Sequence, residues 1–159
     1  MNIANNLAQT VVHSVTKETV TFLETAAQTQ GKHLLIEVQL PPKGEGPPLH
    51  THDEFVESFE CVSGKLTLIY GDQKLIKTLL PGDTFSVPIN EKHTFANHHD
   101  EPLVFKVKLT PPSHFEESMR IHYGLMDDGL CNKKGQPKSL AHTALILTLQ
   151  NTRIAGIPI

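Results

Sequence analysis

The stretch PPLHTHDEFVESFECVSGK, residues 47–65, places two histidines two positions apart in front of an acidic residue and a strand-like run. Residues i and i+2 of a strand point to the same face, so His50 and His52 can direct both imidazoles to one point. Glu57 can add a carboxylate after a bend, and Glu54 is an alternative if the strand bends differently. This segment therefore predicts a histidine-rich site beside a sheet.

A second segment, GDTFSVPINEKHTFAN (residues 82–97), offers a fourth ligand, His93. Three neutral imidazoles and one carboxylate form a borderline-hard donor set that suits a divalent transition metal, namely Fe, Mn, Ni, Zn or Cu. A five- or six-coordinate ion would keep one or two positions open. The competing interpretation is a set of polar surface residues near strand ends.

Outside these segments, residues 10–110 contain many short runs rich in branched and aromatic residues, such as TVTFLET, HLLIEVQL and LVFKVKL. Several alternate apolar and polar residues with period two, and turn signals such as Gly71-Asp72 and Pro81-Gly82 separate them. Short strands at this spacing favour an antiparallel sandwich or barrel. The expected fold class is therefore all-β.

The pattern changes after residue 110. In PPSHFEESMRIHYGLMDDG, Phe115, Met119 and Met126 fall at helical spacing, and Ser113 with Glu116 matches a capping box. The later run KSLAHTALILTLQ fits either a second helix or a strand. We expect one β-rich domain with a short helical appendage at its C-terminal end.

Composition and charge narrow the function classes. A chain of 159 residues is most simply one domain. The net charge of −3 and the lack of any lysine or arginine block argue against nucleic-acid binding. No apolar run reaches the length of a membrane span, and the first residues lack a signal-peptide pattern. Two cysteines do not make a disulfide framework, so we expect a cytoplasmic protein.

The two segments resemble the motifs of the cupin superfamily. The first motif is matched by His50, His52, Glu57 and Gly64, although its opening glycine is assigned to neither Gly44 nor Gly46. The second motif is matched by a further set: Gly82, Pro88, His93 and Asn97. Asn90 replaces a glycine of the second motif, and asparagine is among the few residues that tolerate a left-handed backbone.

This resemblance implies a double-stranded β-helix, the jelly-roll cupin barrel, within residues 1–112. Residues 113–159 would form a C-terminal helical extension packed on the barrel. Metal binding by the four candidate ligands would then be expected. Small cupins commonly pair through their sheets, so we also expect a homodimer, in which the strand-like TVVHSV (residues 10–15) could take part.

Strand alternation also predicts a pocket lining. If Glu57 and His93 point inward, the residues at alternate positions after them do so too, namely Phe59, Cys61, Phe95 and Asn97. Core packing explains the two phenylalanines equally well, and Cys61 has no base beside it, which favours an inert thiol.

For the function, a metal-dependent enzyme acting on a small organic molecule is the first hypothesis, with dioxygenase chemistry ahead of isomerase or decarboxylase chemistry. Glu57 is a possible base, which requires an elevated pKa in an apolar pocket. Two alternatives stay open: a non-catalytic module that binds a metal or small molecule, and a metal site that only stabilises the barrel.

Overall fold

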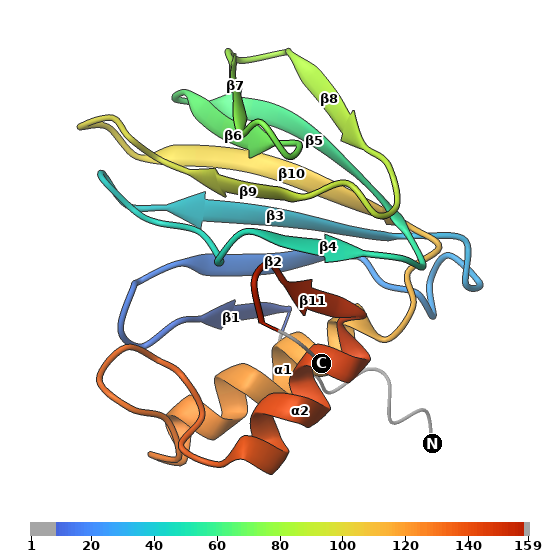
Figure 1. The fold of residues 1–159 in the computed structure, drawn as a ribbon, viewed down its shortest axis with the longest axis vertical. Helices are drawn as coiled ribbons and strands as arrows, with labels where there is room; N and C mark the ends of the chain where they lie inside the picture. The colour runs from blue at the N-terminus through green and yellow to red at the C-terminus, as the bar shows by residue number, and fades with distance from the viewer. Residues whose placement is uncertain (1–8, 158–159) are drawn as a thin grey trace.

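Two antiparallel β-sheets enclose the hydrophobic core in the computed structural model, which describes residues 9–157 (Figure 1). The strands are β1 (Thr10–Val12), β2 (Thr19–Glu24), β3 (Leu34–Leu40), β4 (His50–His52), β5 (Val56–Ser63), β6 (Leu66–Tyr70), β7 (Leu75–Leu79), β8 (Thr84–Val87), β9 (His93–Ala96), β10 (Leu103–Thr110) and β11 (Thr152–Ile154). The helices are α1 (Phe115–Asp127) and α2 (Leu140–Leu149). This is the all-β, double-stranded β-helix architecture that the sequence predicts, with two short helices near the C-terminal end.

The larger sheet has the strand order β1-β2-β3-β10-β5-β8. Its central strands alternate strictly between buried and more exposed positions, as β3 and β10 show. Their inward side chains are branched or aromatic, and Leu34, Leu103, Phe105 and Leu109 have no exposed surface. Burial of such side chains is the main source of stability for a sheet of this kind.

The smaller sheet has the order β11-β4-β9-β6-β7 and carries the histidine strands side by side. His50 of β4 lies opposite His93 of β9 in the antiparallel register, although the two residues are far apart in sequence. On its other edge β4 pairs with β11, where Thr152 lies opposite His52. The three candidate histidine ligands therefore come from interior strands of the smaller sheet, whereas Glu57 lies on β5 of the larger one.

The C-terminal part of the chain contributes both helices and a strand. Helix α1 confirms the predicted helix, and it buries Met119 and Met126. The predicted capping box does not form: Ser113 adopts a left-handed φ of 48° and its hydroxyl donates to Glu54 Oε2 at 2.7 Å. The second run is a helix, α2, of which only Ile146 is buried.

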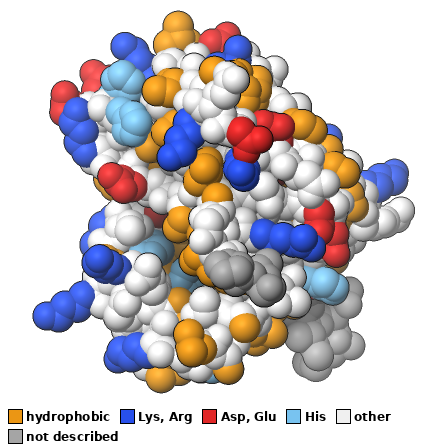
Figure 2. Space-filling view, in the orientation of Figure 1, with side chains coloured by type: hydrophobic (Ala, Val, Ile, Leu, Met, Phe, Trp, Pro, Cys, Tyr) orange, Lys and Arg blue, Asp and Glu red, His pale blue; other side chains and the backbone are white. Residues whose placement is uncertain are grey.

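Helix α2 leaves several apolar side chains at the surface. Leu140 is 88 % exposed and Leu145 is 45 % exposed. Hydrophobic side chains are accordingly visible at the helical end of the molecule in Figure 2. Neither described helix is long and apolar enough to cross a membrane.

Candidate metal centre

Four side chains from three strands converge inside the barrel. His50 and His52 come from β4, Glu57 from β5 and His93 from β9. One ligand atom from each lies within 4.8 Å of the others, so a single ion could contact all four. All four residues are buried, with 5 %, 3 %, 6 % and 1 % of their surface exposed, respectively. The structure thus brings together the complete predicted ligand set.

Backbone carbonyls hold the three imidazoles in one tautomer. The Nδ1 atom of His50 lies 2.7 Å from Pro48 O, and that of His93 lies 3.0 Å from Glu91 O. The Nδ1 atom of His52 lies 3.2 Å from Gln150 O and 3.1 Å from Asn151 O. A carbonyl oxygen only accepts, so each Nδ1 carries a proton, and a ring in its neutral form then keeps its lone pair on Nε2. Such second-sphere contacts are characteristic of histidines that bind metals.

The Nε2 atoms of two of the histidines face Glu57. His93 Nε2 lies 2.5 Å from Glu57 Oε2, and His52 Nε2 lies 3.4 Å from the same oxygen. Among the described residues, His52 Nε2 is a buried nitrogen without a hydrogen-bond partner. A buried polar atom without a partner is costly, and an ion at the centre of the cluster would satisfy it. The donor set and this unpartnered atom both fit a bound metal.

The electrostatics of the cluster favour ionised Glu57. Burial alone would raise the pKa of the Glu57 carboxyl, but its contacts with His52 and His93 hold that pKa well below its usual range. A general base at this position would need an elevated pKa, which these contacts oppose, and a catalytic role for Glu57 stays a prediction. An ionised carboxylate among imidazoles is instead suited to be a metal ligand.

Two of the histidines, His50 and His93, have pKa values that are shifted in opposite directions. Burial, together with the charges of His93 and His52, lowers the pKa of His50 to about 4. Burial is the strongest single effect on His93 and acts to lower its pKa, but the hydrogen bond and charge of Glu57, together with the contacts of Glu91, outweigh burial and raise that pKa. His50 is therefore neutral at pH 7, which is the form that binds a cation.

Aromatic rings surround the cluster. Phe55 lies 4.4 Å from His52 between ring centroids, and Phe115 of α1 lies 6.4 Å from the same imidazole. Phe59 lies 6.3 Å from His93 and 6.1 Å from Phe95. The sequence did not single out either Phe55 or Phe115 as a neighbour of the site. The helical spacing of Phe115 indicated only an apolar face, and Phe55 lies in the loop between β4 and β5, where strand alternation gives no direction.

The other two predicted lining residues are Cys61 on β5 and Asn97, which directly follows β9. Burial raises the pKa of the Cys61 thiol, which agrees with an inert thiol. The Asn97 amide nitrogen donates to Pro41 O at 2.9 Å and to Glu101 O at 2.7 Å, and its oxygen accepts from His99 N. Asn97 thus ties loop backbones together, and a pocket-lining role for these residues stays a prediction.

Two glycines bring the loop before β4 close to its neighbours. Gly44 stands six positions before His50, which is the spacing of the opening glycine of the first motif, so leaving that glycine unassigned was wrong. A Cβ at Gly44 would lie 2.9 Å from Pro41 O, and one at Gly46 would lie 2.2 Å from Phe95 O. A side chain at Gly46 would push the loop away from β9, which carries His93, whereas one at Gly44 would crowd the turn that follows β3.

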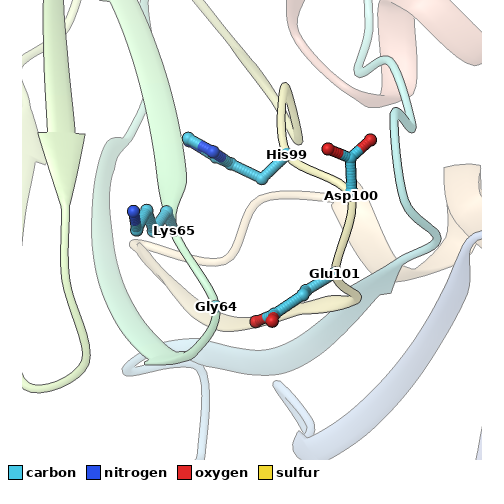
Figure 3. Close-up of a pocket in the computed structure, with 5 residues that line it drawn as sticks. All are labelled: Gly64, Lys65, His99, Asp100 and Glu101. Carbon is cyan, nitrogen blue, oxygen red and sulfur yellow. The ribbon is translucent and has the colours of Figure 1, made fainter.

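Two surface cavities lie away from the cluster. One, of about 250 Å³, is lined by Gly64, Lys65, His99, Asp100 and Glu101 (Figure 3). The other, of about 420 Å³, runs along β7 and β8 from Lys77 to Thr84. Neither contains a member of the histidine cluster, and the mixed charges of the first indicate a solvated loop surface.

The fold and the cluster together define a double-stranded β-helix with a buried candidate metal centre. Residues 36–109 match the family model described as Cupin_2, a cupin domain, so this chain contains a cupin domain. The matched range includes all four candidate ligands. No curated protein matches the chain in sequence.

Solved structures with the same fold are remote in sequence. The polyketide cyclase RemF from Streptomyces resistomycificus is 24 % identical with a TM-score of 0.52, and the match covers 58 % of this chain and 64 % of that one. A predicted oxalate decarboxylase from Thermotoga maritima is 19 % identical with a TM-score of 0.54 and coverages of 59 % and 80 %.

A sugar phosphate isomerase of the cupin superfamily from Silicibacter pomeroyi is 21 % identical with a TM-score of 0.55, and the match covers 71 % of this chain and 76 % of that one. The match to the polyketide cyclase, in contrast, covers less than two thirds of the length of that protein. At these identities the similarity shows the shared fold.

Proposed function

We propose that this protein binds one divalent transition-metal ion through His50, His52, Glu57 and His93 and uses it in a reaction on a small organic molecule. The observation that carries the proposal is the convergence of four buried ligand atoms within 4.8 Å of one another. A bound ion would supply Lewis-acid polarisation of a substrate oxygen or, as iron, the capacity to react with dioxygen.

The residues of the chain have separate tasks in this proposal. The three imidazoles present Nε2 lone pairs because backbone carbonyls accept their Nδ1 protons. Glu57 contributes a negative charge and offsets part of the charge of the ion. Phe55 and Phe115 limit the access of water to His52, which lowers the local dielectric constant and strengthens these electrostatic contacts.

The reaction class is ranked by resemblance to cupins, with dioxygenase chemistry first and isomerase or decarboxylase chemistry next. The neighbours named above carry a cyclase, a decarboxylase and an isomerase in their descriptions, so one fold supports several reactions. The low pKa of Glu57 favours mechanisms in which this residue stays a ligand over those in which it takes up a proton.

Non-catalytic binding of a metal or a small molecule is the second candidate function. The observation that favours it is the low exposure of the four ligand residues, none of which exceeds 6 %. A catalytic centre needs an approach for its substrate, so a closed site is more typical of a structural or storage role.

Metal content tests the first part of the proposal. We expect about one transition-metal ion per chain in tag-free protein by elemental analysis, and a loss of most of that metal in His50→Ala and His93→Ala. The exposed His98 lies close in sequence to His93 and provides the matched control, because His98→Ala should retain the metal. Wild-type protein that neither carries nor takes up metal would refute the proposal.

Activity tests the second part. If iron is the ion present, oxygen consumption over a panel of phenols, thiols and diketones should reveal turnover that His93→Ala lacks. If zinc, nickel or manganese is present, isomerase and decarboxylase assays come first. Metal-loaded protein that turns over no compound, but whose metal spectrum shifts on adding one, would favour the non-catalytic candidate.

A further inference from the structure

The last described strand lies directly beside the strand that carries two of the candidate ligands. In Figure 1, β11 lies along the edge of the sheet next to β4. The antiparallel register places Thr152 opposite His52 and Ile154 opposite His50. The segment that precedes β11 thereby comes to lie against the His52 imidazole, although about 100 residues separate them in sequence.

The His52 ring depends on that segment for its hydrogen bond. Its Nδ1–H points to the carbonyls of Gln150 and Asn151, at 3.2 Å and 3.1 Å, and lies 3.3 Å from the Thr152 hydroxyl. His50 and His93 differ, because each uses a carbonyl two residues before it, at Pro48 and Glu91. Of the three imidazoles, His52 alone is oriented by a distant part of the chain.

Asn151 holds this arrangement from two sides. Its carbonyl faces the His52 ring, while its side-chain oxygen accepts from the backbone amides of Asp53 and Glu54 at 2.7 Å and 3.0 Å. These amides directly follow His52, so Asn151 fixes the backbone on which the ring is mounted. Its φ of 51° is left-handed, a conformation that asparagine tolerates better than most residues. A neighbouring ion pair, Arg153 to Asp53 at 2.6 Å, is exposed.

We infer that Asn151 is a positioning residue for the metal centre: it clamps the His52 segment so that the Nε2 atom of this ring faces the other ligands. The inference rests on the proposed metal binding and adds a dependence of the site on the C-terminal end of the chain. Asn151 touches no metal itself and acts through His52. Loss of such second-sphere contacts typically weakens metal binding about 10- to 100-fold.

Two substitutions separate positioning from simple support of the strand. Asn151→Gly keeps the left-handed backbone without strain but removes the side-chain acceptor. Asn151→Asp keeps an acceptor oxygen at the same place and is the conservative rescue. Arg153→Ala is the control, since it removes the adjacent exposed ion pair and leaves Asn151 in place.

The first readout is nitrogen-15 NMR of the histidine rings in metal-free protein. We expect His52 of the wild type to carry its proton on Nδ1 with slow solvent exchange, and the same in Asn151→Asp and Arg153→Ala. Asn151→Gly should exchange that proton at least tenfold faster. A wild-type His52 ring protonated on Nε2 alone would overturn the inference, whatever the variants do.

The second readout is Co²⁺ affinity, measured by competition with a chromophoric chelator. Asn151→Gly should bind Co²⁺ about tenfold or more weakly than the wild type, and Asn151→Asp should recover most of the affinity. If Asn151→Gly lowers the melting temperature but leaves both ring exchange and affinity unchanged, Asn151 only supports the strand and the inference fails. If the wild type does not bind Co²⁺, the proposed metal binding fails, while the ring measurement still decides the positioning role.

Discussion

Glu18 and Tyr123 form a hydrogen bond between the start of β2 and helix α1, with the tyrosine hydroxyl donating at 2.6 Å. Burial raises the pKa of the Glu18 carboxyl, and the bond from Tyr123 only partly opposes this shift. The folded state therefore holds a proton on Glu18 at pH values where the unfolded chain has released it. This residue lies away from the histidine cluster and offers a separate probe of the fold.

The sign of the pH effect follows from proton binding. Above the ordinary carboxyl pKa the folded state binds more protons than the unfolded state, so the contribution of Glu18 to stability falls as pH rises. We expect Glu18→Gln to match the wild type most closely near pH 4 and to become relatively more stable toward pH 7. Urea unfolding across this range measures the difference. Parallel stability profiles for the two proteins would contradict the assignment.

Single positions explain much of what the sequence could and could not reveal. The spacing of His50, His52, Glu57 and His93 predicted the cluster, because ligand geometry restricts which residues can meet on adjacent strands. Asn90 has a φ of 63°, which confirms the prediction that asparagine preserves a left-handed backbone there. The direction of the Glu57 pKa shift could not be read from the spacing, because it depends on how closely two imidazoles approach the carboxylate.

Strand β10 is the central element of the larger sheet and pairs with both β3 and β5. Its Phe105 is fully buried and lies 6.2 Å from Phe59 and 5.1 Å from Phe95 between ring centroids. Phe59 belongs to the same sheet and Phe95 to the smaller one, so this ring joins the two layers. Contacts of this kind hold the two sheets of the barrel together.

Removal of the Phe105 ring should lower the stability of the folded protein. We expect Phe105→Ala to lower the free energy of unfolding by about 3–5 kcal/mol, because it leaves a cavity in a closely packed core. Ile76 on β7 is 70 % exposed, so Ile76→Ala should change stability by less than about 0.5 kcal/mol. Equilibrium unfolding in guanidinium chloride compares the two. Similar losses for both variants would show that the core is not where we place it.

At the level of elements, alternation predicted the long strands but not β11. Strands β3 and β10 have enough residues to show period two, whereas Thr152–Ile154 has only three. Its partner, β4, lies about 100 residues earlier, and local pattern carries no information on such a pairing. The run that forms α2 is apolar on nearly every side, which is why helix and strand could not be separated from its pattern.

In the whole molecule, the residues after 112 are joined to the barrel. A division at residue 112 into a barrel and a helical extension stays a prediction. The structure adds that β11 from the second part lies within a sheet of the first. Helix α1 also places Phe115 beside His52. The two parts therefore share the candidate metal centre.

The oligomeric state is the prediction that belongs to the whole molecule. The predicted N-terminal strand pairs with β2 of its own chain, and β1 and β7 form edges of their sheets. Leu75 and Ile76 of β7 are exposed, and free edges of this type can pair with a second copy. We expect light scattering at micromolar concentration to give twice the 17.6 kDa mass of the chain. A mass of one chain would remove the homodimer.

The pairing of β4 with β11 also affects when the candidate metal centre can form during synthesis of the chain. During translation His52 leaves the ribosome well before the residues that orient its ring, because about 100 residues lie between them. At about 5–20 residues per second, that interval lasts roughly 5 to 20 s. The nascent chain would meet cellular metal with one imidazole still free to rotate. Stable capture of the ion would then wait until residues 150–152 have been made, which keeps the centre from being filled before β11 has joined its sheet.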